Sequence, residues 1–168
     1  PGRTVFTTTA RTVSSVILEN GSTLDLGATT GNALGAVSGE GTLRISSLVS
    51  PVALPGGTYT NFVAPTGGTI EYYNLPATCV LPSLNIYNNL IFSNSTASNF
   101  DAQVNNSLTI NGNLTVTRTG TGQANFLFGQ GGNFSYTVAR NVSIAAGCKI
   151  GIASASTNAH NFSINGNL

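Results

Sequence analysis

The seven residues Leu108-Thr-Ile-Asn-Gly-Asn-Leu114 hold the pattern that decides the fold of this 168-residue chain. With Φ for an apolar residue, they read Φ-x-Φ-x-x-Asn-Φ, which places two apolar side chains on one face of a short extended segment. The same pattern recurs along the chain, and this recurrence of short half-buried strands predicts a repeat protein. The other copies are Leu84–Leu90, Tyr136–Val142 and Phe162–Leu168.

The asparagines of this pattern follow one another at intervals of about 25 residues. We expect them at one corner of successive coils, where a side-chain amide can bond the next amide and the turning backbone. A structural role of this kind is more typical of stacked amides than ligand binding. The four residues of this predicted ladder are Asn89, Asn113, Asn141 and Asn167.

A second pattern, Thr-Φ-charged-Φ, occurs three times in the first half of the chain. It predicts that Asp25, Arg44 and Glu71 project outward from successive coils as a charge column. Opposite charges one rung apart attract by about 0.2–1 kcal/mol per pair, so this column selects register more than it adds stability. The three copies are Thr23–Leu26, Thr42–Ile45 and Thr69–Tyr72.

The two patterns together predict an all-β fold, because Gly, Asn, Thr and Ser interrupt every window in which a helix could form. A period in the twenties is typical of a parallel β-solenoid, here a right-handed β-helix with about 25 residues per coil and six to seven coils. Residues 1–168 are then one solenoid segment, which we interpret as a piece of a longer polypeptide. An antiparallel β-sandwich is the rival, although its loops need not keep a constant period.

The composition excludes several function classes. Charged side chains make up only 7 % of the chain and the net charge is +1, so the chain cannot neutralise several phosphates of a nucleic acid. No apolar run approaches the roughly 18 residues that a membrane span needs. One His and two Cys leave little material for a metal cage, and we expect no cofactor. Cys79 and Cys148 are expected as separate thiols, on coils too far apart for a disulfide.

Catalysis is tested by the carboxylates, since β-helices also include polysaccharide lyases and hydrolases. Glu71 and Asp101 are the one pair expected on adjacent coils, but no base or acid cluster accompanies them, so we predict no enzyme. His160 is expected in a solvent-facing loop. Tyr73 and Tyr87 are expected at outward positions, from which a ring can stack on a sugar or contact a surface.

Three stretches carry a resemblance to a known group: Gly67–Asn74, Leu81–Ser93 and Leu108–Val116. They resemble the repeat regions of very large surface proteins that the type IX secretion system of gliding bacteria exports. The resemblance implies a long extracellular β-helical adhesin with a signal peptide and a C-terminal sorting domain, in some members carried along the cell surface in gliding motility.

The sequence therefore predicts an extracellular structural and adhesive β-helix segment on a bacterial cell surface. Its expected partners are an extracellular surface or glycan and the secretion and surface-anchoring machinery. A carbohydrate-active or glycan-binding β-helix is the alternative, and a spacer without a ligand is a third. Threonine runs such as Thr115–Thr121 leave ice binding as a remote option.

Overall fold

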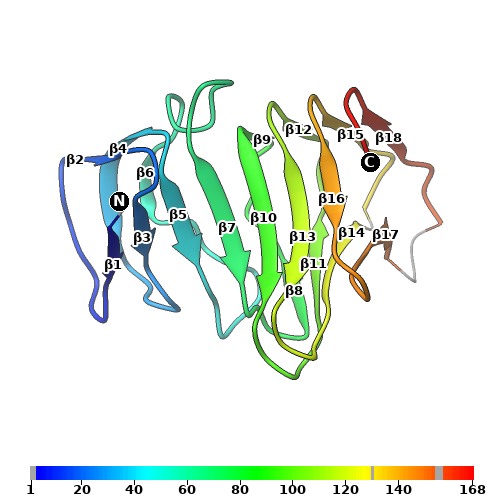
Figure 1. Cartoon of the computed structure of the whole chain (residues 1–168), viewed down its shortest axis with the longest axis horizontal. Helices are drawn as coiled ribbons and strands as arrows, with labels where there is room; N and C mark the ends of the chain where they lie inside the picture. The colour runs from blue at the N-terminus through cyan, green and yellow to red at the C-terminus, as the bar shows by residue number, and fades with distance from the viewer. Residues whose placement is uncertain (1–2, 130, 154–156) are drawn as a thin grey trace.

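The computed structural model describes residues 3–129, 131–153 and 157–168, and within these ranges the chain is all-β, with 18 strands and no helix (Figure 1). Every strand pair in the described part is parallel. The strands stack as a β-solenoid of about six turns with about 24 residues per turn, which confirms the predicted fold class. In Figure 1 the near strands run downward while the chain advances to the right, so the coil is right-handed.

One sheet runs the length of the described solenoid and receives one strand from each coil. This sheet, sheet A, has seven strands in the order in which the chain makes them. The coils differ in length: Thr4 aligns with Thr23, 19 residues later, Thr42 with Thr69, 27 residues later, and Thr69 with Asn89, 20 residues later. The strands of sheet A are β1 (Thr4–Phe6), β3 (Thr23–Asp25), β5 (Thr42–Ile45), β7 (Thr69–Tyr73), β10 (Asn89–Asn94), β13 (Leu114–Arg118) and β16 (Val142–Ile144).

The other faces of the solenoid change along its length. The first coils add one further strand each, and these form the three-stranded sheet B: β2 (Ser15–Leu18), β4 (Ala33–Gly39) and β6 (Gly56–Thr58). The later coils add two. Sheet C contains β8 (Thr78–Val80), β11 (Phe100–Val104), β14 (Ala124–Phe128) and β17 (Lys149–Ile152), and sheet D contains β9 (Ile86–Tyr87), β12 (Leu108–Ile110), β15 (Ser135–Val138) and β18 (Asn161–Ile164).

The core lies inside the coils, where each apolar side chain packs on its counterpart one rung away. The inward position of sheet A is apolar in every aligned strand, and rungs about 4.8 Å apart bring these side chains into contact. Burying each one stabilises the fold by about 1.5–3 kcal/mol. From β3 onward this column consists of Leu24, Leu43, Ile70, Leu90, Leu114 and Val142.

The loop 59–68 after β6 is the largest departure from the repeat. It returns the Phe62 ring to the core, where the ring is fully buried. A Cβ at Gly68 would lie 2.1 Å from this ring and 2.6 Å from the Gly41 carbonyl oxygen, so the close approach requires glycine at that position. The loop continues directly into β7.

Candidate functional site

The four asparagines of the predicted ladder lie at one corner of successive coils, between sheet D and sheet A. The Oδ1 atom of Asn89 accepts a hydrogen bond from the backbone N–H of Asn113 at 2.9 Å. The same bond recurs from Asn141 to Asn113 at 3.1 Å and from Asn167 to Asn141 at 3.0 Å. An amide-to-amide bond is recorded between Asn113 and Asn89, at 3.4 Å. The ladder therefore links side chain to backbone more than amide to amide.

The backbone carbonyls of these residues complete the corner. Leu90 donates its N–H to the Asn113 oxygen at 3.0 Å, and Leu114 does the same to Asn141. Asn113 and Asn141 are thus bound to the preceding coil through both the N–H and the C=O. A turning chain leaves these groups without strand partners, and a buried unpaired backbone group is costly, which explains why amide side chains occupy the corner.

Further amides at other corners work in the same way and were missed from the sequence. Asn74, with a positive φ of 47°, accepts the N–H of Ser95 at 2.8 Å. Asn99 accepts the N–H of Gln123 at 2.8 Å, and Asn133 accepts that of Ala159 at 3.0 Å. The sequence signal for these residues is an asparagine beside a strand end. The residue that it binds one coil later is not another asparagine, so no repeat of asparagines marks these corners.

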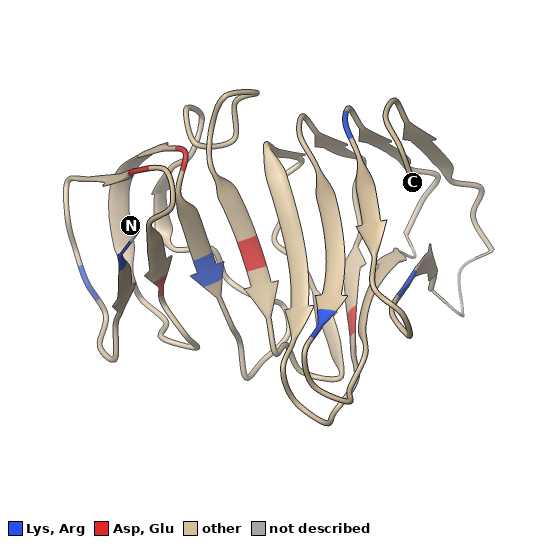
Figure 2. Cartoon of the chain, viewed as in Figure 1, with Lys and Arg blue, Asp and Glu red and all other residues tan. Residues whose placement is uncertain are grey.

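The charge column is formed in register, since Asp25 aligns with Arg44 and Arg44 with Glu71. The Arg44 Nη1 lies 2.8 Å from the Asp25 Oδ2, and its Nε lies 2.8 Å from the Glu71 Oε2. Ser93, one coil further, donates its hydroxyl to the other oxygen of Glu71. Figure 2 shows the charged segments of β5 and β7 side by side on a surface that carries few other charges. Four successive coils are thereby joined on one face.

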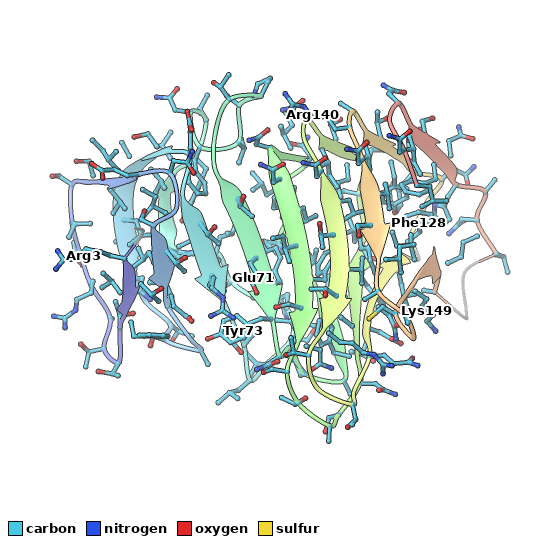
Figure 3. The ribbon with its side chains drawn as sticks, viewed as in Figure 1. Arg3, Glu71, Tyr73, Phe128, Arg140 and Lys149 are labelled. Carbon is cyan, nitrogen blue, oxygen red and sulfur yellow. The ribbon has the colours of Figure 1, made fainter. Side chains whose placement is uncertain are left out.

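Asp25 differs from the expected outward-projecting residue, because only 1 % of it is exposed. Tyr73 reaches back over two coils and donates its hydroxyl to the Asp25 Oδ1 at 2.8 Å. The N–H of Gly27 binds the same oxygen at 2.9 Å. Arg44 lies over the Tyr73 ring, 4.1 Å from its centroid, as a cation–π contact. Asp25 faces away from the core, but the long side chains of Arg44 and Tyr73 cover it. Figure 3 shows Glu71 and Tyr73 on β7.

The protonation of this column follows from its contacts. Partial burial acts to lower the pKa of Arg44, but the carboxylates of Glu71 and Asp25 outweigh it and raise that pKa. Burial and the hydrogen bond to Asp25 raise the pKa of Tyr73 to about 12. The Tyr73 phenol therefore stays protonated and donates to Asp25 at neutral pH.

Of the two tyrosines predicted as surface contacts, Tyr87 does not lie at the surface, so that prediction was wrong. Tyr87 is 1 % exposed and inside the coil, where its hydroxyl lies 3.2 Å from that of Tyr72. The register explains this, since Tyr87 aligns with Ile110 and Ile86 with Thr109. The corner before Asn89 is one residue shorter than the corner before Asn113, and a one-residue slip exchanges the two faces of a strand. Ile86 is consequently the exposed residue.

The carboxylate pair considered for catalysis is not on adjacent rungs of one sheet. Glu71 is aligned with Arg44 and Ile91 in sheet A. Asp101 belongs to sheet C, where it aligns with Asn125 and accepts a hydrogen bond from the Asn125 Nδ2 at 2.8 Å. The two acids thus belong to different faces, and each is already bound to a neighbouring coil.

His160 also lies differently from the prediction. It is half-buried, and its ring stacks on Phe134 with centroids 6.0 Å apart and contacts Phe128 and Tyr136. Its Nδ1 accepts the N–H of Phe134 at 3.4 Å. The residue is part of an aromatic cluster at the C-terminal coils, where Figure 3 labels Phe128.

Metal-ligating side chains form no cluster within the described ranges. There, no group of three or more His, Cys, Asp or Glu residues could hold an ion. Cys79 and Cys148 are free thiols, and burial raises the pKa of Cys79.

Two large hollows lie on the described surface. One, of about 620 Å³, lies at the first described coil, where it is lined by Val5, Val16 and Leu24 and by Arg3 and Arg11. The other, of about 590 Å³, lies between the end of sheet B and the start of sheet D. Glu19 also lines the first hollow, and the described lining of the second includes no charged residue.

The described chain has no helix of the length and apolarity that crossing a bilayer requires. No protein-family model, curated protein or solved structure matches this chain.

Proposed function

We propose that this chain is a structural and adhesive segment of a large secreted protein on a bacterial cell surface. Its outer side chains would meet an extracellular surface or a glycan, and secretion and anchoring machinery would act on the rest of such a protein. Gliding motility is the process suggested by the resemblance of residues 67–116 to exported repeat proteins.

The observation that carries this proposal is where the polar side chains are used. The ladder amides and the charge column bind the next coil instead of converging on a cavity. Polar groups that bind neighbouring coils to one another stabilise the stack, as expected of a structural protein.

The outward faces supply the second argument, because they present short uncharged side chains in columns. On sheet D, Thr109 aligns with Thr137 and Thr137 with Ser163, which repeats a hydroxyl every rung. A column of hydroxyls about 4.8 Å apart suits contact with a polar polymer or a hydrated surface. With few charges nearby, such binding would depend weakly on salt.

The test is the binding of the labelled chain to neutral and acidic polysaccharides, to glass and to bacterial cells. We expect saturable binding that survives high salt, and Thr137→Lys on sheet D to weaken it if that face makes the contact. Thr115→Lys on sheet A is the matched substitution on another face, since both threonines are half-buried strand residues.

Two results would contradict the adhesive role. If the chain binds none of these surfaces, the result would support a spacer without a ligand. Release of sugar from a polysaccharide, lost in Glu71→Gln or Asp101→Asn, would instead support a carbohydrate-active β-helix.

A further inference from the structure

Three Asn-Gly pairs occur in the chain, and their surroundings differ. In such a pair the backbone nitrogen of the glycine can attack the side-chain carbonyl carbon of the asparagine, because glycine has no Cβ to hinder the approach. The attack requires that the asparagine side chain and the glycine N–H are both free to move. The three pairs are Asn20-Gly21, Asn111-Gly112 and Asn165-Gly166.

Two of these pairs have the same neighbours in the sequence. The segments Ile110–Leu114 and Ile164–Leu168 both read Ile-Asn-Gly-Asn-Leu, and each begins at the last residue of a strand of sheet D. The intrinsic reactivity of Asn111 and Asn165 is therefore the same. Any difference between their rates in the folded chain reports the structure around them.

Asn111 is held at both of its reacting groups. Its Nδ2, the nitrogen that would leave, donates to the Val63 oxygen at 3.1 Å. The N–H of Gly112 donates to the Asn88 oxygen at 2.8 Å, and Gly112 is buried. A nitrogen that is bound inside the stack cannot turn toward the asparagine side chain unless the coil opens locally.

Asn20 and Asn165 lack these restraints. Both asparagines and the glycines after them are exposed. Among the described residues, neither side-chain amide has a hydrogen-bond partner, and neither does the N–H of Gly21 or Gly166. The attacking nitrogen and the leaving nitrogen are thus both free in these two pairs.

We propose that Asn20 and Asn165 are sites of spontaneous deamidation and that the fold protects Asn111. The glycine nitrogen forms a bond to the asparagine Cγ, and the bond from Cγ to Nδ2 breaks. Nδ2 leaves as ammonia and takes the proton of the glycine N–H. Water then opens the five-membered imide at either of its carbonyls, which gives aspartate or isoaspartate.

The reaction changes both the charge and the backbone of the chain. Each conversion replaces a neutral amide with a carboxylate, and because the net charge is only +1, two conversions leave the chain net negative. Isoaspartate also adds a methylene group to the backbone at position 165. That position lies just before Asn167, whose N–H binds the Asn141 Oδ1 at 3.0 Å, so the product loosens this link of the amide ladder.

The experiment incubates the folded 168-residue chain in mildly alkaline buffer, beside the same chain unfolded in concentrated urea. Peptide mapping by mass spectrometry follows the modified fraction at each Asn-Gly pair. In urea we expect Asn111 and Asn165 to react at the same rate. In the folded chain we expect Asn20 and Asn165 to react and Asn111 to be at least about tenfold slower, because its reaction needs local opening.

Asn165→Gln is the control variant, because glutamine keeps an amide but forms the corresponding ring far more slowly. It should abolish the change at that position and leave the rate at Asn20 unaltered. The products at Asn20 and Asn165 in the natural chain should include isoaspartate as well as aspartate, since direct hydrolysis of the amide gives aspartate alone.

Three results would each overturn the proposal. Equal rates at Asn111 and Asn165 in the folded chain would show that the hydrogen bonds of Asn111 and Gly112 give no protection. Absence of modification at either Asn20 or Asn165 in the folded chain would show that this pair is not free to react. Formation of aspartate without isoaspartate would exclude the attack by the glycine nitrogen.

Discussion

The coils at the two ends of this solenoid are built on different plans. The first two coils, from Thr4 to Thr23 and from Thr23 to Thr42, contain two strands each, and we call them the narrow coils. The coils from β7 onward contain three strands each, and we call them the wide coils. The narrow coils enclose aliphatic side chains, and their aromatic residue, Phe6, is 69 % exposed. The wide coils enclose a stack in which Phe92 lies between Tyr72 and Phe126, at 6.1 and 5.1 Å. The change from two to three strands per coil thus accompanies a change from an aliphatic to an aromatic core.

The corner column shows the same division. At one outward position of sheet A the aligned residues are Thr4, Thr23, Thr42 and Thr69, and then Asn89. In the narrow coils the N–H at this position binds a backbone carbonyl, as Thr42 binds the Ser22 oxygen at 2.8 Å. In the wide coils from Asn113 onward it binds an asparagine side chain. At this position an asparagine Oδ1 thus replaces the backbone acceptor that the preceding coils use.

The largest expected effect separates the two cores. Phe92→Ala should destabilise the protein by about 3–5 kcal/mol, because it leaves a cavity between two rings in a fully buried stack. Phe6→Ala, in the narrow coils, should change the free energy of unfolding by less than about 0.5 kcal/mol. Chemical denaturation measures both. Equal losses would contradict the burial of Phe92 and the exposure of Phe6.

The charge column joins the narrow coils to the wide ones, and Arg44→Gln breaks it at its centre. We expect a loss of about 1.5–3 kcal/mol, since the buried Asp25 carboxylate loses a charged donor. Arg11→Gln is the control, because Arg11 is exposed in the same narrow region. A denaturation midpoint that moves equally in the two variants would contradict a coupling between the regions.

The amide ladder belongs to the wide coils. Asn113→Ala should cost about 1 kcal/mol and speed the hydrogen exchange of the Asn141 amide, which loses its acceptor. Asn113→Asp keeps an acceptor oxygen and should retain the protection of Asn141. Asn106→Ala is the control, because that exposed amide bonds its neighbouring residue. Unchanged exchange of the Asn141 amide in Asn113→Ala would remove the role assigned to the ladder.

The smallest expected effect is a change in stability at alkaline pH, and it tests the hydrogen bond from Tyr73 to Asp25. The pKa of Tyr73 is about 12 in the folded protein and about 10 in an unfolded chain. The stabilisation it adds is therefore complete below pH 10 and is lost as the pH rises through about 12. Tyr73→Phe should lose less stability than the natural chain over this interval. Parallel pH dependences of the two proteins would contradict the assignment.

The repeat itself could be predicted from sequence because it depends on local alternation and on the spacing of asparagines. Leu108 and Ile110 point inward in the structure, as their alternation indicates. Tyr87 was assigned to the wrong face because the length of the corner after it sets the register, and a neighbouring coil selects that length. His160 was misplaced for a similar reason: its ring partners come from another coil.

What the sequence determined by itself is the class of fold, since parallel stacking follows from a period of apolar and amide residues that needs no knowledge of distant contacts. The tertiary structure alone decided the change from two to three strands per coil, the covering of Asp25 by Tyr73 and the separation of sheets B and D. Each depends on which residues of different coils lie beside one another. That arrangement is set by the packing of the whole stack, because rungs about 4.8 Å apart bring together residues that are a full coil apart in the sequence.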